Sequence, residues 1–280
     1  MRPDMAYSYK FLLVKEIGDG VFNVQLNRPE KRNAINLEIW DEIGDVFSKL
    51  DTDCNCRAVI LSGNGKAFSS GIEVQSLAEG LTTFEEDDVA RKGRQILRFA
   101  NRMERSFTMI EKCCKPVIAA MHTYCLGIAM DISTACTIRY CTKDTEFSVK
   151  EVALGLASDM GVLNRLPKIV GNHSWIYEAA LTGRHFRANE ALQQGLVSRV
   201  FDSYDDLMAA AKETAKVIAT NSPVAVQGVK IVLNYARDHP VDDSLRYVAL
   251  WNMSQGQTND IAESAVALMT KGPKPIYAKL

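Results

Sequence analysis

The first half of the chain alternates short apolar runs with longer segments in which apolar residues recur every three or four positions. Residues 11–17 and 21–26 are short apolar runs on either side of an Asp-Gly pair, a pattern typical of a β-hairpin. The recurring positions predict helices over 37–50 and 89–113. Further strands are predicted at 57–62, 115–122, 138–141 and 145–149, and a short helix at 128–136. This alternation of strands and helices predicts an α/β core with largely parallel sheets.

The pattern changes at about residue 205 and becomes wholly helical. Helices are predicted at 205–220, 223–238 and 242–255. We therefore predict two parts, an α/β core over residues 1–205 and a helical region over 206–280 that packs on a neighbour or a partner subunit. Residues 77–88 are acidic and contain Gly and Thr, which predicts a mobile loop.

The composition is that of an ordinary protein with a full core. The chain has 280 residues, of which 47% are apolar and 24% charged, and its formal net charge is -1. That balance does not favour nucleic acid or an anionic membrane surface as the main partner, and no basic stripe stands out. No apolar run is long enough to cross a bilayer, so no membrane span is expected.

The cysteines, histidines and chain ends suggest no metal site and one targeting motif. Seven cysteines without a Cys-X-X-Cys pair predict reduced, mostly buried thiols. The four histidines have no metal-ligand spacing, and the N-terminus lacks the layout of a secretory signal. Ala278-Lys279-Leu280 is close to the Ser-Lys-Leu peroxisomal address, which predicts a peroxisome or related organelle. A mitochondrial location, with these residues as a frayed tail, is the alternative.

Three carboxylates lie in otherwise apolar or small-residue surroundings, namely Asp131, Glu151 and Asp159. Carboxylates are rarely buried unless they are paired or used, so we predict a shared pocket in which protons are moved. Neighbouring carboxylates push their pKa values apart, which allows one to act as a base and another as an acid. The alternatives are a charge partner of a helix N-terminus for Asp131, a solvated charge paired with Lys150 for Glu151, and a cap for a helix at Met160 for Asp159.

Two Gly-containing turns follow predicted strands, in residues 66–74 and 117–131. The second turn opens a helix, so its first backbone N–H groups lack partners and carry the positive end of the helix dipole. Two such N–H groups from separate turns can hold one carbonyl oxygen and stabilise the negative charge that develops on it. A tight connection is the alternative for either turn alone.

An ordered set of motifs resembles the enoyl-CoA hydratase/isomerase (crotonase) superfamily over about residues 10–270. The matching motifs are residues 27–34 (NRPEKRNA), 66–72 (KAFSSGI), 115–120 (KPVIAA), 135–139 (ACTIR), 180–183 (ALTG) and 191–197 (ALQQGLV). Within the superfamily the chain is most similar to the Δ3,5-Δ2,4-dienoyl-CoA isomerases. That narrower match rests on residues 140–144 (YCTKD), 149–152 (VKEV), 155–159 (GLASD), 164–172 (NRLPKIVGN), 237–239 (RDH) and 251–254 (WNMS).

The resemblance implies a crotonase-like fold, a spiral of β-β-α units followed by a helical trimerisation region, and a homo-trimer or hexamer. The implied substrate is a fatty acyl-CoA thioester, with CoA as part of the substrate and no metal or redox cofactor. The thioester oxygen would bind the backbone N–H groups of Ile72 and Ile128. Residues of one segment would bind CoA, namely Ser70, Gly71, Ile72, Glu73 and Val74.

The resemblance also assigns the carboxylates. Glu151 would be the base at C2, Asp159 would lie deeper in the pocket and return a proton at C6, and Asp131 would tune the other two or order water. Hydratases of the superfamily have glutamates at the positions of 131 and 151, so an aspartate at 131 and the additional Asp159 favour isomerisation of 3,5-dienoyl-CoA to 2,4-dienoyl-CoA. An enoyl-CoA hydratase, a Δ3-Δ2-enoyl-CoA isomerase and a non-catalytic acyl-CoA-binding protein are the alternatives.

One residue departs from the family pattern. Ile128 stands where the superfamily usually has a glycine. The backbone N–H is retained, but a β-branched side chain restricts the backbone and adds bulk. The sequence therefore predicts a narrower pocket or a partly disabled oxyanion hole at this turn.

Overall fold

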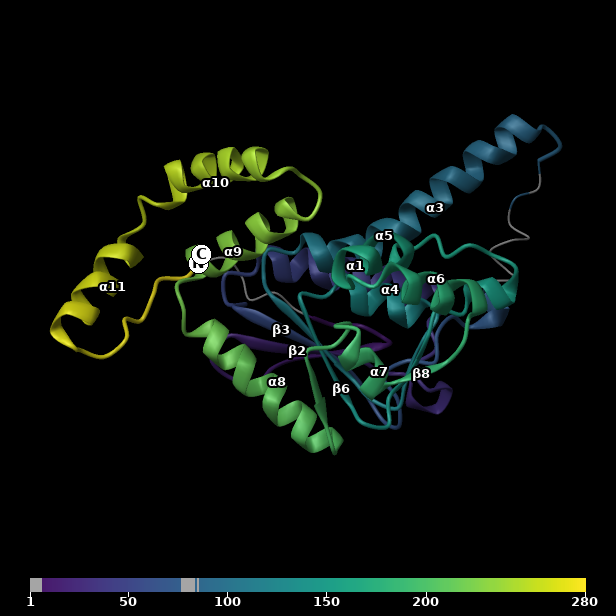
Figure 1. The fold of residues 1–280 in the computed structure, drawn as a ribbon, viewed down its shortest axis with the longest axis horizontal. Coiled ribbons are helices and arrows are strands. Elements are labelled where there is room, and N and C mark those ends of the chain that lie inside the picture. Colours follow the sequence, from purple (N-terminus) through teal and green to yellow (C-terminus); the bar gives the residue numbers. More distant parts are fainter. Residues whose placement is uncertain (1–6, 77–83, 85) are drawn as a thin grey trace.

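The computed structural model describes residues 7–76, 84 and 86–280. The loop expected at 77–88 therefore lies largely outside the described residues. The predicted α/β architecture is confirmed, with two sheets and helices around them (Figure 1).

The larger sheet has six strands in the order β1-β2-β3-β4-β6-β9. β1 pairs antiparallel with β2 as the predicted hairpin, and the other pairs are parallel. The strands are β1 Leu12–Glu16, β2 Val21–Leu26, β3 Ala58–Gly63, β4 Val117–Met121, β6 Ile138–Thr142 and β9 Arg199–Phe201. Every residue of β3 and β4 is buried, as expected for parallel strands that are covered on both faces.

A smaller sheet lies beside the candidate site and has the order β5-β7-β8. It consists of β5 Tyr124–Leu126, β7 Glu146–Ser148 and β8 Phe186–Arg187. β5 and β7 pair in parallel, and β7 and β8 pair antiparallel. These strands are only two or three residues long, and β5 and β8 were not predicted.

Helices cover both faces of the larger sheet (Figure 1). On one side lie α1 Leu37–Thr52, α3 Val89–Lys112, α4 Ile128–Ala135, α5 Val162–Ile169 and α6 His173–Thr182. α8 (Tyr204–Ala219) lies on the other side. Its residues Leu207, Ala211 and Ala215 are fully buried against the sheet. Further helices are η1 Pro29–Lys31, η2 Glu151–Leu154, α7 Ala188–Gln193, α9 Pro223–Ala236, α10 Val241–Gln255 and α11 Asn259–Thr270.

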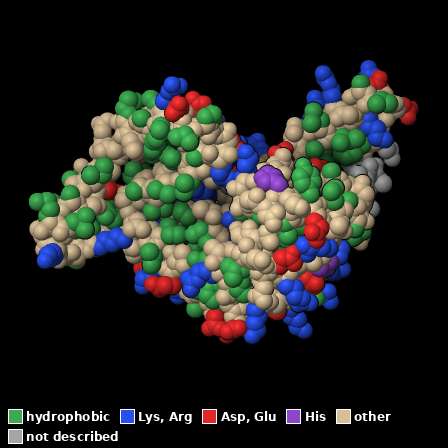
Figure 2. Space-filling view, viewed as in Figure 1, with side chains coloured by type: hydrophobic (Ala, Val, Ile, Leu, Met, Phe, Trp, Pro, Cys, Tyr) green, Lys and Arg blue, Asp and Glu red, His purple; other side chains and the backbone are tan. Residues whose placement is uncertain are grey.

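The three C-terminal helices α9, α10 and α11 form an arm that extends from the body (Figure 1). The buried Lys230 in α9 ties the arm to the core, because its Nζ donates to the carbonyl oxygens of Ile110, Cys113 and Lys115 near the end of α3. Many apolar side chains on the arm remain exposed, and Figure 2 shows them spread over its surface. The division at residue 205 stays a prediction, although α8 belongs to the packed layers of the core.

All seven cysteines are free thiols, and five of them are buried, as the sequence predicted. Among the described residues, none of the helices combines the length and the apolar character needed to cross a bilayer.

Candidate active site

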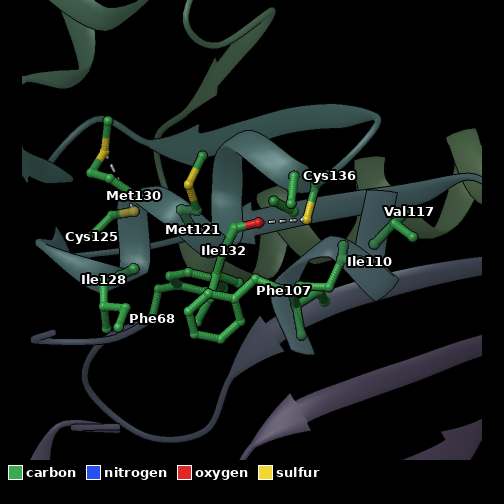
Figure 3. Packing of buried hydrophobic residues seen from close by; sticks show 14 of the residues in the cluster. Phe68, Phe107, Ile110, Val117, Met121, Cys125, Ile128, Met130, Ile132 and Cys136 are labelled. Carbon is green, nitrogen blue, oxygen red and sulfur yellow. Dashed lines mark hydrogen bonds between the residues drawn. The ribbon is translucent and has the colours of Figure 1, made fainter. Parts of the chain in front are cut away.

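The candidate site is built on α4, a helix in which all eight residues are buried. Its apolar residues Ile128 and Ile132 pack beside Phe68 and Phe107 in the buried cluster shown in Figure 3. Burial on every side fixes the position of the helix, and with it the positions of Asp131 and of the N-terminal turn.

The two predicted turns lie side by side. Ser69 forms a parallel bridge with Cys125, and the Ser69 N–H donates to the Tyr124 oxygen over 2.9 Å. Ile72 forms a second bridge with Ile35, in which Ile35 bonds the backbone of residues 71 and 73. The N–H of Ile72 therefore points away from that bridge. Neither it nor the N–H of Ile128 has a hydrogen-bond partner within the described part of the chain, and both residues line the same cavity.

Gly127 shapes the second turn, and sequence reasoning did not single it out. Its φ of 53° and ψ of -121° are accessible to glycine at little cost. Its N–H donates to the Ser148 oxygen over 2.8 Å, and a Cβ added to it would lie 3.3 Å from Oε1 of Glu151. The absence of a side chain at 127 thus lets the helix N-terminus approach the Glu151 carboxylate.

Ile128 does not obstruct this turn with its side chain. The residue is only 5% exposed and belongs to the buried cluster with Phe68 (Figure 3). Its bulk is therefore accommodated mainly in the core, whereas its N–H remains without a partner beside the cavity.

We expect Ile128→Ala to cost about 2–5 kcal/mol of folding free energy, because it leaves a cavity in the core. It should change kcat by no more than a few fold, since the N–H is retained. Urea unfolding and the rate per folded molecule measure the two effects. A hundred-fold loss of kcat with little loss of stability would mean instead that the side chain shapes the reacting site.

Asp131 is the most deeply buried of the three carboxylates, with no exposed surface. Its Oδ1 accepts the N–H of Val162 over 2.7 Å and the hydroxyl of Ser158 over 3.3 Å, while Oδ2 is buried without a partner. Val162 is the first residue of α5. Oδ1 of Asp131 therefore binds a helix N-terminus, which is the alternative role that the sequence suggested for this residue. Burial, and then the charge of Glu151, raises the pKa of Asp131 to about 8, so the carboxyl is mostly protonated near neutral pH.

This raised pKa gives a stability prediction with a definite sign. Folding raises the Asp131 pKa from 3.8 to about 8. The protonated Asp131 carboxyl therefore makes its full contribution to the free energy of unfolding below about pH 4, and this contribution is lost as pH rises through about 8. Asp131→Asn does not titrate. We compare the free energy of unfolding of the variant with that of the original protein. The difference should shift in favour of the variant by on the order of a few kcal/mol as pH rises from 5 to 8. Calorimetric Tm values at both pH values measure this, and parallel pH profiles would contradict it.

Glu151 begins η2 directly after Lys150. It is half-buried and its Oε2 has no hydrogen-bond partner among the described residues. Burial, and then the charge of Asp159, raises the pKa of the Glu151 carboxyl above its ordinary value. No salt bridge joins Glu151 to Lys150 in the described part of the chain, and the Lys150 ammonium instead donates to Nε2 of His185 over 2.7 Å.

Asp159 lies in the loop before α5 and lines the same cavity. It does not cap α5, whose N-cap is Gly161. The expectation that Asp159 lies deeper than Glu151 is wrong, since Asp159 is exposed and Asp131 occupies the deepest position. Desolvation, and then the charge of Glu104, still raises the Asp159 pKa.

The predicted CoA-binding segment forms one rim of the cavity. Ser70, Gly71, Ile72 and Val74 line the cavity, and Val74 is 64% exposed. Glu73 is already engaged, because both of its oxygens accept from the Arg28 guanidinium over 2.9 Å. That bidentate pair lowers the Glu73 pKa and holds the segment in place.

The cavity itself has a volume of about 580 Å³ and a largely apolar wall. It brings together the three carboxylates and the two turns. The apolar wall comes from α1, α3, η2 and the loop before α5, through Leu37, Trp40, Ile96, Phe99, Met103, Leu154, Leu156 and Met160. Such a wall suits an acyl chain, and the free N–H groups suit a carbonyl oxygen.

The profile of the enoyl-CoA hydratase/isomerase family matches residues 16–275. The chain belongs to this family. It is 50% identical to the rat mitochondrial Δ(3,5)-Δ(2,4)-dienoyl-CoA isomerase over 95% of this chain and 81% of the relative. It is 42% identical to the peroxisomal Δ(3,5)-Δ(2,4)-dienoyl-CoA isomerase of Arabidopsis thaliana over 98% of this chain and 99% of the relative.

A solved structure shows the same fold. The crystal structure of a putative enoyl-CoA hydratase from Streptomyces coelicolor superposes with a TM-score of 0.86 at 28% identity, and covers 98% of both chains. The predicted crotonase fold of this enoyl-CoA hydratase/isomerase family member is thereby confirmed.

Proposed function

We propose that the protein isomerises 3,5-dienoyl-CoA to 2,4-dienoyl-CoA in the oxidation of unsaturated fatty acids. The observation that carries this proposal is a single apolar cavity in which two carboxylates with raised pKa values lie with two unpaired backbone N–H groups. The names of the rat and Arabidopsis relatives support the same reaction.

In the proposed reaction the thioester oxygen accepts from the N–H groups of Ile72 and Ile128. Glu151 removes the proton at C2, and the resulting negative charge spreads from the oxygen along the conjugated chain. Asp159 delivers a proton to C6, so the double bonds move from C3 and C5 to C2 and C4. Exchange with water then returns a proton to Asp159 and removes one from Glu151.

The carboxylates differ in a way that supports these roles. A raised pKa makes Glu151 a stronger base and keeps a proton on Asp159 to a higher pH. A protonated Asp131 places no additional negative charge beside Glu151. Because these groups account for both proton transfers, we propose that the reaction needs no metal or redox cofactor.

An activity assay of the purified protein with 3,5-dienoyl-CoA as the substrate tests the proposal. Isomerisation conjugates the diene with the thioester, so long-wavelength ultraviolet absorbance should increase. Loss of enoyl absorbance on 2-enoyl-CoA, with no reaction on the 3,5-diene, would identify a hydratase. Acyl-CoA binding without turnover of any of these thioesters would identify a binding protein.

We also propose that the arm formed by α9–α11 joins copies of the chain into a trimer or a pair of trimers. Its exposed apolar residues support this, among them Leu233, Leu245, Leu250, Met253, Ile261 and Val266. An apolar surface of this kind is typical of an interface. The mass of the particle in solution tests the assembly.

The relatives carry mitochondrial and peroxisomal names, and both organelles agree with the proposed reaction. We propose the peroxisome or a related organelle for this chain. The Ala278-Lys279-Leu280 sequence and the peroxisomal name of the plant relative support that choice.

A further inference from the structure

The N-terminal half of α3 projects from the body of the molecule (Figure 1). Every residue from 89 to 98 is exposed, although this helix also forms one wall of the candidate site through Ile96, Phe99 and Met103. The faces of this half of α3 that do not line the cavity are therefore accessible to solvent and to a binding partner.

One of those faces is strongly basic. α3 contains seven Lys and Arg residues against two Glu, a net charge of +5 in a chain whose formal net charge is -1. Five arginines recur every three or four residues and so share one face of the helix. This arginine stripe consists of Arg91, Arg94, Arg98, Arg102 and Arg105. No basic stripe was predicted from the sequence, because the near-neutral total charge conceals this local concentration of arginines.

Most of the stripe is free to bind an anion. Arg91 pairs with Asp88 over 3.1 Å and Arg102 pairs with Asp41 over 2.5 Å, and all four side chains are largely exposed. Surface pairs of this kind are weak and exchange readily. Arg94, Arg98 and Arg105 have no acidic partner among the residues that the structure describes. Guanidinium groups bind phosphate oxygens in a bidentate geometry, which makes phosphate the natural counterpart.

An apolar residue beside the stripe indicates the kind of surface. Leu97 is 60% exposed, does not line the cavity and follows Arg94 by three positions, so it lies next to the stripe, whereas the exposed Val89 shares the opposite face with Ile96. A helix with arginines on one face and an exposed aliphatic side chain next to them has the character of a helix that lies at a membrane surface. A nucleic acid or a hydrophilic acidic protein would not need the aliphatic residue.

We propose that α3 is an interfacial helix through which the protein docks reversibly on an anionic lipid surface. The arginine stripe contacts lipid phosphates, and Leu97 enters the headgroup region. Docking holds the cavity, which Ile96 and Phe99 line from the other side of the helix, within about one helix diameter of the bilayer, where acyl chains partition. That advantage rests on the proposed acyl-CoA substrate, but the docking itself does not require it.

Sedimentation with vesicles tests the docking in the absence of substrate. We expect the protein to bind vesicles of equal parts phosphatidylcholine and phosphatidylglycerol, to bind less as salt increases, and not to bind pure phosphatidylcholine. Arg94→Gln combined with Arg98→Gln should lower the partition coefficient about thirty-fold. Arg94→Lys combined with Arg98→Lys retains the charge and should keep most of the binding.

Lys15→Gln combined with Lys212→Gln is the matched control, because it removes the same charge from exposed positions on β1 and α8. An equal loss in this control, unchanged binding in the Arg94/Arg98 variant, or equal binding to neutral vesicles would overturn the proposal. A change in particle mass without lipid, with vesicle binding unaffected, would assign the stripe to contacts between copies of this chain. The kcat on dissolved 3,5-dienoyl-CoA is measured separately, so failure of the docking leaves the proposed reaction unaffected.

Discussion

Glu151→Gln should lower turnover of 3,5-dienoyl-CoA by about 10²–10⁴-fold and leave acyl-CoA binding intact. The glutamine has the same shape but cannot accept the proton from C2. Glu151 is half-buried, its Oε2 is unpaired and its Oε1 lies next to Gly127, and the two N–H groups do not depend on its charge. The absorbance assay gives the loss in rate, and calorimetric titration with a saturated acyl-CoA gives the binding.

The pH dependence of the original enzyme provides an independent check. Glu151 must be ionised to act as a base, so the rate should fall as pH decreases through its raised pKa. The acidic limb of kcat should therefore lie above the ordinary glutamate range near 4.3. Glu146→Gln is the matched control, because Glu146 contacts His185 over 3.1 Å and does not line the cavity. A comparable rate loss in that control would show that the effect of Glu151→Gln is not specific to proton abstraction.

Much of the fold was predictable because its apolar patterns are local. The hairpin of β1 and β2, the helices α1 and α3, and the buried strands β3 and β4 all follow from periodicity. α5 did not, since it has only eight residues and contains Pro167, a residue that usually marks a helix end. The short strand β8 was missed because two residues carry no recognisable alternation.

The sequence predicted which carboxylates belong to the site, but not how they are arranged in it. Carboxylates in apolar surroundings indicated Asp131, Glu151 and Asp159, and all three line one cavity. Their order of burial did not follow from the sequence, because it depends on which long-range partners reach each group. Asp131 is the deepest, since α5 brings the Val162 N–H to it from 31 residues away. The pairing of Ser69 with Cys125, which joins the two turns, likewise depends on the three-dimensional arrangement of the chain.

Asp159→Asn should abolish formation of the 2,4-dienoyl product and yet preserve the first proton transfer. The amide cannot deliver a proton to C6, whereas Glu151 can still remove and return the proton at C2. In deuterated water the variant should therefore exchange the C2 proton of 3,5-dienoyl-CoA without isomerising it, which nuclear magnetic resonance detects. Glu151→Gln should lose both processes, so the two variants separate the two steps.

The same variant also tests the electrostatic coupling between the carboxylates. The charge of Asp159 helps to raise the Glu151 pKa, so its removal should move the acidic limb of C2 exchange to lower pH. Glu104→Gln is the matched control, since Glu104 raises the Asp159 pKa from α3 without lining the cavity. It should retain isomerisation at neutral pH. Full isomerase activity in Asp159→Asn would disprove the two-carboxylate scheme, because Glu151 would then have to carry the proton from C2 to C6 alone.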